Sequence, residues 1–246
     1  MAGVAKEAES GMRGFLSRVV PRGYGLFGAA CNVTFALVFS VALAAAAAEA
    51  EPVTVVALGD SLTAGYGLPP EAGLVPQLQS WLVAAGADVV VQNAGVSGDT
   101  TAGGQARLDW ALAPGTDALI VALGGNDMLR GLPPSEARAN LDAILTGAEA
   151  RGLPVLLVGM TAPGNYGPEY KADFDAIYPE LAAQHHALLA PDFFDGFRAA
   201  GADMADPSSF AGWMQDDGIH PNAEGVGLII ATLGPQVQEL LSQVAK

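Results

Sequence analysis

Cysteine is almost absent from this sequence, whose 246 residues include only Cys31. A single cysteine cannot form an intrachain disulfide, and this one lies inside a long apolar run, where we interpret it as a filler residue. The chain beyond that run therefore has no disulfide and no thiol nucleophile. Histidine is also scarce, with three in the chain. A Cys/His zinc site is excluded, and a multi-histidine site would need nearly all of them. We expect no metal and no cofactor.

Basic residues are few, with 11 Lys and Arg against 26 Asp and Glu. Four of the basic and three of the acidic residues precede residue 51, which leaves residues 51–246 with 7 basic residues, 23 acidic residues and a net charge of −16. Such a surface repels phosphate backbones and anionic lipid headgroups. We therefore expect a small-molecule partner, no nucleic acid, and no charge-driven docking on membranes.

Charge is missing altogether from Leu26–Ala48, a run preceded by three arginines and followed by the small-residue motif Ala48-Glu49-Ala50. This pattern is typical of a secretory signal with cleavage before Glu51. About 20 apolar residues can also span a bilayer, so an uncleaved membrane anchor is the alternative. We expect residues 1–50 to be an export signal or anchor. The rest would be periplasmic or secreted, or tethered outside the cytoplasm.

From Val53 onward, short apolar runs alternate with longer helical patterns. The expected strands are 54–58, 89–92, 118–123, 155–158 and 187–190, and the expected helices are 74–85, 101–113, 135–151, 169–185 and 222–244, the last with a break near Gly234-Pro235. Continuous apolar strands indicate a parallel sheet covered on both faces. The alternation predicts one α/β domain over residues 51–246, a three-layer α/β/α, doubly wound (flavodoxin-like) structure with a parallel five-stranded sheet.

The first expected strand runs directly into GDSLTAGYG, which places Ser61 at the carboxyl edge of the sheet. Ligands bind at this edge in doubly wound sheets. The turn is not the G-x-S-x-G elbow of the α/β-hydrolases. By itself it is a weak indication of catalysis, because Asp and Ser are common turn residues.

A second candidate lies near the end of the chain, in DDGIHP. Asp217 stands three residues before His220, so its carboxylate can accept the imidazole Nδ1–H and leave Nε2 facing a nucleophile. Taken alone, the motif favours a surface turn with a solvated histidine before a helix-capping Asn222 over a catalytic pair.

The ends of the second and third expected strands carry further polar turns, SGDTT and GGND. Acyl transfer needs several N–H groups aimed at a developing oxyanion, and the backbone N–H groups of Ser61 and Gly98 with the amide of Asn126 could supply them. Each turn alone could be a capped βα connection. Together with a serine and an Asp-x-x-His motif, they indicate an acyl-transfer site.

These four segments, GDSLTAGYG, SGDTT, GGND and DDGIHP, resemble the four motif blocks of the GDSL/SGNH hydrolase family. The resemblance extends from Val53 to the C-terminus, and GLVPQLQ, AIYPELA and WMQDDGIHPN resemble the branch of bacterial acyl-CoA thioesterase I, also called protease I, lysophospholipase and arylesterase. It implies the SGNH hydrolase fold for residues 51–246. The implied catalytic residues are Ser61 as nucleophile with Asp217 and His220, and the implied oxyanion hole is Ser61, Gly98 and Asn126.

We therefore expect a monomeric serine esterase that acts on carboxylic esters, with thioesters as a further class. The family resemblance makes the loop 128–134, with Met128 and Leu129, a candidate acyl-binding segment, and a plain surface connector is an equal alternative. Residues 163–167 after the fourth expected strand, which include Tyr166, are a second candidate wall. A carbohydrate O-acetylesterase with the same catalytic residues is an alternative, and an exported binding module without activity is another. A nucleotide-binding protein is disfavoured, because a G-x-G-x-x-G fingerprint is absent.

Overall fold

The computed structural model describes residues 51–244. The expected export signal or anchor, residues 1–50, lies outside the described residues. Between residues 51 and 244, no helix combines the length and the hydrophobicity that a membrane span requires.

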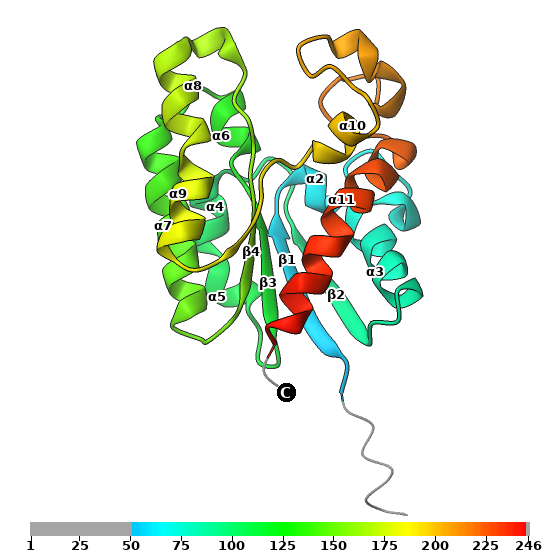
Figure 1. Cartoon of the computed structure of the whole chain (residues 1–246). Helices are drawn as coiled ribbons and strands as arrows, with labels where there is room; N and C mark the ends of the chain where they lie inside the picture. Colours follow the sequence, from blue (N-terminus) through cyan, green and yellow to red (C-terminus); the bar gives the residue numbers. More distant parts are fainter. Residues whose placement is uncertain (1–50, 245–246) are drawn as a thin grey trace, which may run out of the picture. The chain divides into compact units, whose positions relative to one another are not determined.

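A five-stranded, entirely parallel sheet forms the centre of the domain (Figure 1). Its strands are β1 (Val53–Gly59), β2 (Val89–Gly95), β3 (Ala118–Ala122), β4 (Val155–Val158) and β5 (Leu188–Ala190), in the order β2-β1-β3-β4-β5. The direction of strand progression reverses between β1 and β3, and such a switch point is where doubly wound sheets bind their ligands. The expected fold class is confirmed.

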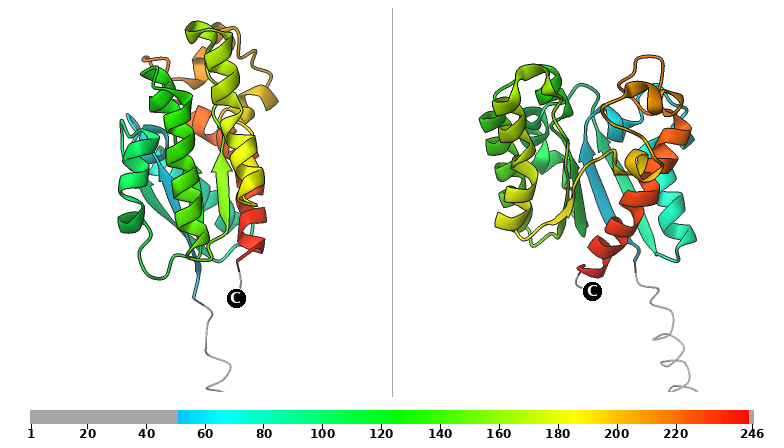
Figure 2. Two further views of the ribbon diagram at one scale, coloured as in Figure 1. Left: turned by 90° about the vertical axis from the view of Figure 1, so that its left-hand side faces the viewer. Right: turned by 45° about the horizontal axis from the view of Figure 1, so that its top comes forward.

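Helices cover both faces of the sheet and make the three layers visible in Figures 1 and 2. On one face lie α4 (Thr101–Ala106), α5 (Leu108–Ala111), α7 (Pro134–Glu149), α8 (Pro168–Asp175) and α9 (Ile177–Gln184), and on the other lie α3 (Leu74–Ala84) and α11 (Ala223–Ser242). The remaining elements between residues 51 and 244 are short. They are the helices α2 (Ser61–Ala64), α6 (Gly125–Leu129) and α10 (Asp195–Ala199) and the 3₁₀ turns η1 (Pro70–Ala72), η2 (Gly164–Tyr166), η3 (Pro207–Ser209) and η4 (Ala211–Trp213).

Three helix predictions were wrong in detail: two expected helices are each divided in two, and an expected break in a third is absent. The expected helix 101–113 is divided at Arg107 into α4 and α5, and the expected helix 169–185 is divided at Ala176 into α8 and α9. The second division has a direct cause, because Pro179 has no N–H to donate to the carbonyl one turn earlier.

The expected break near Gly234-Pro235 does not occur, and α11 continues through it. A residue before proline is normally kept out of the helical region by its own Cβ, which Gly234 lacks. The same absence makes room for a neighbouring helix, since a Cβ on Gly234 would lie 2.7 Å from the Trp81 ring. The long terminal helix therefore packs closely against α3 at this position.

Candidate active site

Ser61 is held at the carboxyl edge of the sheet by an abrupt change from strand to helix. Strand β1 ends at Gly59, and Asp60 caps α2, whose first residue is Ser61. The Asp60 carboxylate accepts a hydrogen bond from the Leu62 backbone N–H at 3.0 Å. Side-chain capping of this kind satisfies an N–H that the first turn of a helix leaves free. The serine hydroxyl is thus carried on a rigid corner of the backbone.

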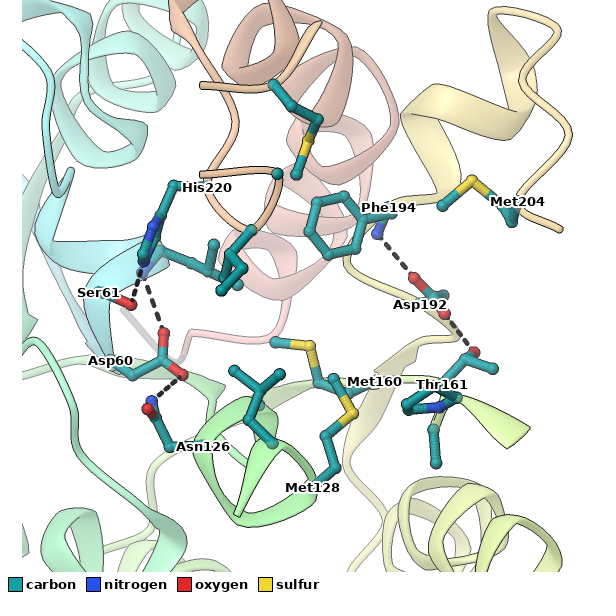
Figure 3. Close-up of a pocket in the computed structure, with 18 of the residues that line it drawn as sticks. Asp60, Ser61, Asn126, Met128, Met160, Thr161, Asp192, Phe194, Met204 and His220 are labelled. Carbon is teal, nitrogen blue, oxygen red and sulfur yellow. Dashed lines mark hydrogen bonds between the residues drawn. The ribbon is translucent and has the colours of Figure 1, made fainter. Parts of the chain in front are cut away.

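The structure brings Ser61, His220 and Asp217 into one hydrogen-bonded chain. His220 Nε2 lies 2.9 Å from Ser61 Oγ, and His220 Nδ1 lies 2.6 Å from Asp217 Oδ2. Figure 3 shows the contact between Ser61 and His220 at one side of a pocket. This is the geometry that a serine nucleophile, a general base and an orienting carboxylate require. The catalytic roles themselves stay predictions.

His220 is positioned by contacts on both sides of its loop. Its carbonyl accepts the Gln215 N–H at 2.8 Å, while the Gln215 side chain donates to the Tyr66 carbonyl at 2.8 Å. The Tyr66 ring packs on the imidazole with ring centroids 4.6 Å apart. Tyr66 was not among the residues that the sequence singled out. Its contact with His220 joins positions 154 residues apart, which no local pattern could indicate.

The Asp217 carboxylate is surrounded by donors. The His220 backbone N–H, the His220 ring and the Ile219 N–H all donate to it, and these hydrogen bonds lower the pKa of Asp217 to about 2. Asp217 is therefore ionised across the neutral range. An ionised carboxylate at Nδ1 stabilises the imidazolium that forms when Nε2 takes a proton.

The three expected oxyanion donors, Ser61, Gly98 and Asn126, line the same pocket. Gly98 is the third residue of a β-turn that the Asp99 N–H closes onto Val96, and its φ of +86° is a conformation that favours glycine. Within residues 51–244, the backbone N–H groups of Ser61 and Gly98 donate to no other group. Both remain free to meet a developing negative charge.

Asn126, the second residue of α6, is oriented by Asp60, which was not among the residues predicted from the sequence. Its amide donates to Asp60 Oδ2 at 3.1 Å, which leaves the second amide hydrogen of Asn126 for a ligand (Figure 3). Asp60 is almost fully buried, and desolvation raises its pKa to about 6 despite the hydrogen bonds from Leu62 and Asn126. Asp60 adjoins Ser61 in GDSL, but its contact with Asn126 spans 66 residues.

Arg107 links the carboxyl ends of β1 and β2, next to Ser61 and Gly98. Its guanidinium donates to the carbonyls of Gly59 and Ala94, at the ends of β1 and β2, and forms a 2.6 Å ion pair with Asp99. Arg107 was also not among the residues predicted from the sequence. The available signal was its rarity, because residues 51–246 contain only seven basic residues and Arg107 follows a helix of small residues.

The pocket beside Ser61 has a volume of about 860 Å³, within the range of small-molecule sites. Its lining is mainly apolar and includes Met128 and Leu129 from the expected acyl-binding loop. Tyr166, the third expected contact, does not line it. That ring lies against Gly131 and its hydroxyl donates to the Leu129 carbonyl at 3.3 Å, so Tyr166 supports the loop from behind.

Polar groups also close the far side of the pocket from Ser61 (Figure 3). There Asp192 accepts hydrogen bonds from the Thr161 hydroxyl and the Phe194 N–H, and it forms an ion pair with Arg198 at 3.2 Å. These groups satisfy one another. Among residues 51–244, no cluster of three His, Cys, Asp or Glu side chains has the arrangement of a metal site.

Comparison with known proteins identifies the family of this chain. The model of the GDSL-like lipase/acylhydrolase family matches residues 57–228. Esterase TesA of Pseudomonas aeruginosa is 40% identical over 194 residues, which are 78% of this chain and 92% of the relative. Thioesterase 1/protease 1/lysophospholipase L1 of Escherichia coli strain K12 is 37% identical over 206 residues, 83% of this chain and 91% of the relative.

A solved structure gives the same result for the fold. The crystal structure of AlinE4, described as an SGNH-hydrolase family esterase, superposes with a TM-score of 0.63 at 41% identity, covering 79% of this chain and 99% of that one. The parallel sheet, the family match and relatives that are esterases and thioesterases lead to one conclusion. The chain belongs to the GDSL-like lipase/acylhydrolase family and is a hydrolase that acts on ester bonds.

Proposed function

We propose that this chain is a serine esterase that works through an acyl-enzyme, with Ser61, His220 and Asp217 as its catalytic triad. The observation that carries the proposal is the hydrogen-bonded chain from Ser61 Oγ to His220 Nε2 and from His220 Nδ1 to Asp217. A serine hydroxyl becomes nucleophilic when an adjacent base takes its proton, and the base works best when a carboxylate fixes its tautomer.

In the first half of the reaction, Ser61 Oγ attacks the ester carbonyl carbon while its proton passes to His220 Nε2. The carbonyl oxygen becomes an oxyanion, which receives hydrogen bonds from the N–H groups of Ser61 and Gly98 and from the Asn126 amide. His220 then returns its proton to the leaving alcohol, or thiol for a thioester, as the tetrahedral intermediate collapses to an ester on Ser61. In the second half, water loses a proton to His220, attacks that ester and releases the acid and the Ser61 hydroxyl.

The pocket supports an apolar acyl group as the preferred substrate feature. Apolar side chains from several segments dominate its lining, among them Met128, Leu129, Phe194 and Phe210. An O-acetylated sugar would place unpaired hydroxyls against this wall, which is costly. The names of the curated relatives, esterase and thioesterase, agree with acyl esters and thioesters as substrates.

The test is hydrolysis of p-nitrophenyl esters from acetate to palmitate by the parent chain, Ser61→Ala and Ser97→Ala. Ser97 lines the same pocket but is not bonded to His220, so it is a matched control. We expect Ser61→Ala to lose turnover by about 10³-fold or more and Ser97→Ala to keep it. A fluorophosphonate should label Ser61 in the parent. A Ser61→Ala variant that retains turnover would disprove the proposal, and acetate-only activity would favour a sugar O-acetylesterase.

For location, we propose export directed by residues 1–50. The support is the sequence pattern of basic residues, an uncharged run at Leu26–Ala48 and a small-residue exit at Ala48-Glu49-Ala50. Expression in a bacterial host followed by N-terminal sequencing of the exported protein should give Glu51 as the first residue. Recovery of the intact chain in the membrane fraction would indicate an anchor, and cytoplasmic recovery would contradict export.

A further inference from the structure

Methionine has an unusual distribution in this structure. The chain has six methionines, of which Met1 and Met12 fall outside the described residues. The other four, Met128, Met160, Met204 and Met214, all line the pocket beside Ser61. They come from four separate segments: α6, the chain after β4, the loop after α10, and the chain after η4. Figure 3 shows Met128 and Met160 together and Met204 at a different part of the wall.

The hydrophobic core between residues 51 and 244 is built almost entirely from other residues. Its buried side chains are those of Val, Leu, Ile, Ala, Phe and Tyr, with Met160 as the one buried methionine. Met128, Met204 and Met214 are half-buried. Methionine is flexible and polarizable, and it suits surfaces that must adapt to ligands of varied shape. Met160 belongs to the core and the other three pack against it, but their shared position on the pocket wall points to a function toward the acyl group in addition to packing.

The same side chains give the pocket a chemical sensitivity. A two-electron oxidant such as hydrogen peroxide transfers one oxygen atom to a thioether sulfur, which yields methionine sulfoxide and water. The pocket is open to solvent, because its lining residues Leu129 and Ile219 are 51% and 46% exposed. Small oxidants can therefore reach the half-buried Met128, Met204 and Met214, whereas Met160 is only 3% exposed and should oxidise more slowly. Ser61, His220 and Asp217 contain no sulfur and would be unchanged.

Oxidation would alter the wall that faces the acyl chain. A sulfoxide is polar, and an apolar chain that covers it removes its oxygen from water without a compensating hydrogen bond. The penalty grows with the length of chain that must lie along the wall. An acetyl group, which stays near Ser61, would be little affected.

We propose that Met128, Met160, Met204 and Met214 form an oxidation site that sets acyl-chain preference. Peroxide-class oxidants convert an esterase that accepts long acyl chains into one restricted to short chains. This inference rests on the proposed serine esterase function.

The experiment treats the full chain with hydrogen peroxide, maps sulfoxides by mass spectrometry, and measures kcat/KM on p-nitrophenyl decanoate and p-nitrophenyl acetate. We expect the decanoate-to-acetate ratio to fall about tenfold or more, while the acetate value stays within about twofold. Incubation with methionine sulfoxide reductases should restore the ratio. A ratio unchanged after oxidation at all four positions would overturn the proposal. The proposal would also be overturned if all four methionines stayed reduced at a peroxide dose that fully oxidises added N-acetylmethionine.

Leucine variants provide the control, because Leu and Met are similar in volume. The quadruple variant M128L/M160L/M204L/M214L should keep its own untreated ratio after peroxide. If the quadruple variant does not fold, the double variant M128L/M204L replaces it. At the same peroxide dose, its decanoate-to-acetate ratio should fall less than that of the parent. An equal fall in the two proteins would count against the proposal. Absence of Ser61-dependent hydrolysis before treatment would instead refute the proposed function itself, so the two failures are distinguishable.

Discussion

At the scale of single residues, Asp60 shows a conflict between stability and the site. Its carboxylate caps α2 and receives the Asn126 amide, yet it is almost fully buried. Burial penalises the charged form, which raises the pKa of Asp60 from 3.8 to about 6. An ionised Asp60 therefore costs stability at neutral pH, while Asn126, the proposed oxyanion donor, is oriented by its hydrogen bond to Asp60. Active sites commonly retain such costs.

The substitution Asp60→Asn should separate the two effects. Because the folded-state pKa is raised, the stability linked to Asp60 is present at low pH and is lost as pH rises from about 3.8 to about 6. The unfolding free energy of Asp60→Asn minus that of the parent should thus be about 2 kcal/mol more positive at pH 8 than at pH 4. Its kcat should fall by about tenfold or more with little change in KM, because the introduced amide can turn a donor, rather than an acceptor, toward the Asn126 amide.

Urea unfolding at pH 4 and pH 8 and steady-state kinetics on p-nitrophenyl acetate make this measurement. Asp88→Asn, at an exposed position before β2, is the matched control and should show neither effect. Parallel stability curves for Asp60→Asn and the parent across this pH range would show that the burial of Asp60 has no such cost.

Individual residues differed in how far the sequence revealed them. Ser61 directly follows a continuous apolar strand, and Asp217 and His220 are three positions apart, so local patterns brought these to attention. The contacts of Asp60 with Asn126 and of Arg107 with Gly59 span 66 and 48 residues. Such contacts depend on the order in which strands assemble, and a single sequence does not specify that order.

At the scale of elements, all five strands were predictable because each is an apolar run between polar turns. The helix division at Arg107 was not, since helical periodicity continues across it. The division at Ala176 had a signal in Pro179, which interrupts the helical pattern but was not used in the prediction. The junction between α7 and α9 was also hidden. His185, at the end of α9, places Nε2 2.8 Å from Asp142 Oδ1 and Nδ1 3.0 Å from Glu149 Oε1, both on α7. Two carboxylate acceptors require two donors, and hence the imidazolium form.

Replacing His185 by Gln should weaken this junction in a pH-dependent way. Burial works against the charged form of His185, but hydrogen bonds to Asp142 and Glu149 outweigh it and raise its pKa above 6.5. The raised pKa means that this stabilisation is complete below pH 6.5 and is lost as pH rises through the folded-state value. The stability difference between the parent and His185→Gln, measured by urea unfolding, should be largest near pH 5.5 and smaller at pH 9.

His186→Asn serves as the control for that comparison, because His186 is the exposed neighbour and Asn tolerates its φ of +51°. Its stability difference from the parent should not vary with pH in this manner. A His185→Gln difference that is constant from pH 5.5 to pH 9 would mean that the ion pairs with α7 contribute nothing measurable.

At the scale of the whole molecule, the pocket combines a predictable part with an unpredictable one. Ser61 and Asn126 follow β1 and β3, on either side of the switch point, as the parallel fold requires. The opposite wall comes from the irregular chain between α10 and α11, which contributes Met204, Ala205 and Phe210. That segment has neither helical nor strand periodicity, so its sequence indicated no position in space. The wall to which we attribute the proposed chain-length preference is thus the part of the pocket where sequence patterns are least informative.

Filling this wall should shorten the acyl chains that the protein accepts. Ala205→Trp adds an indole ring at a position that lines the pocket, where it competes with the far end of a long chain but leaves Ser61 accessible. The kcat/KM for p-nitrophenyl decanoate should fall about tenfold relative to acetate. Ala211→Trp, exposed in η4 and outside the lining, carries the same added bulk and should leave the ratio unchanged. An equal decanoate-to-acetate ratio in the two variants would show that long acyl chains bind elsewhere. The proposal that the methionines beside Ser61 contact long acyl chains would then be wrong.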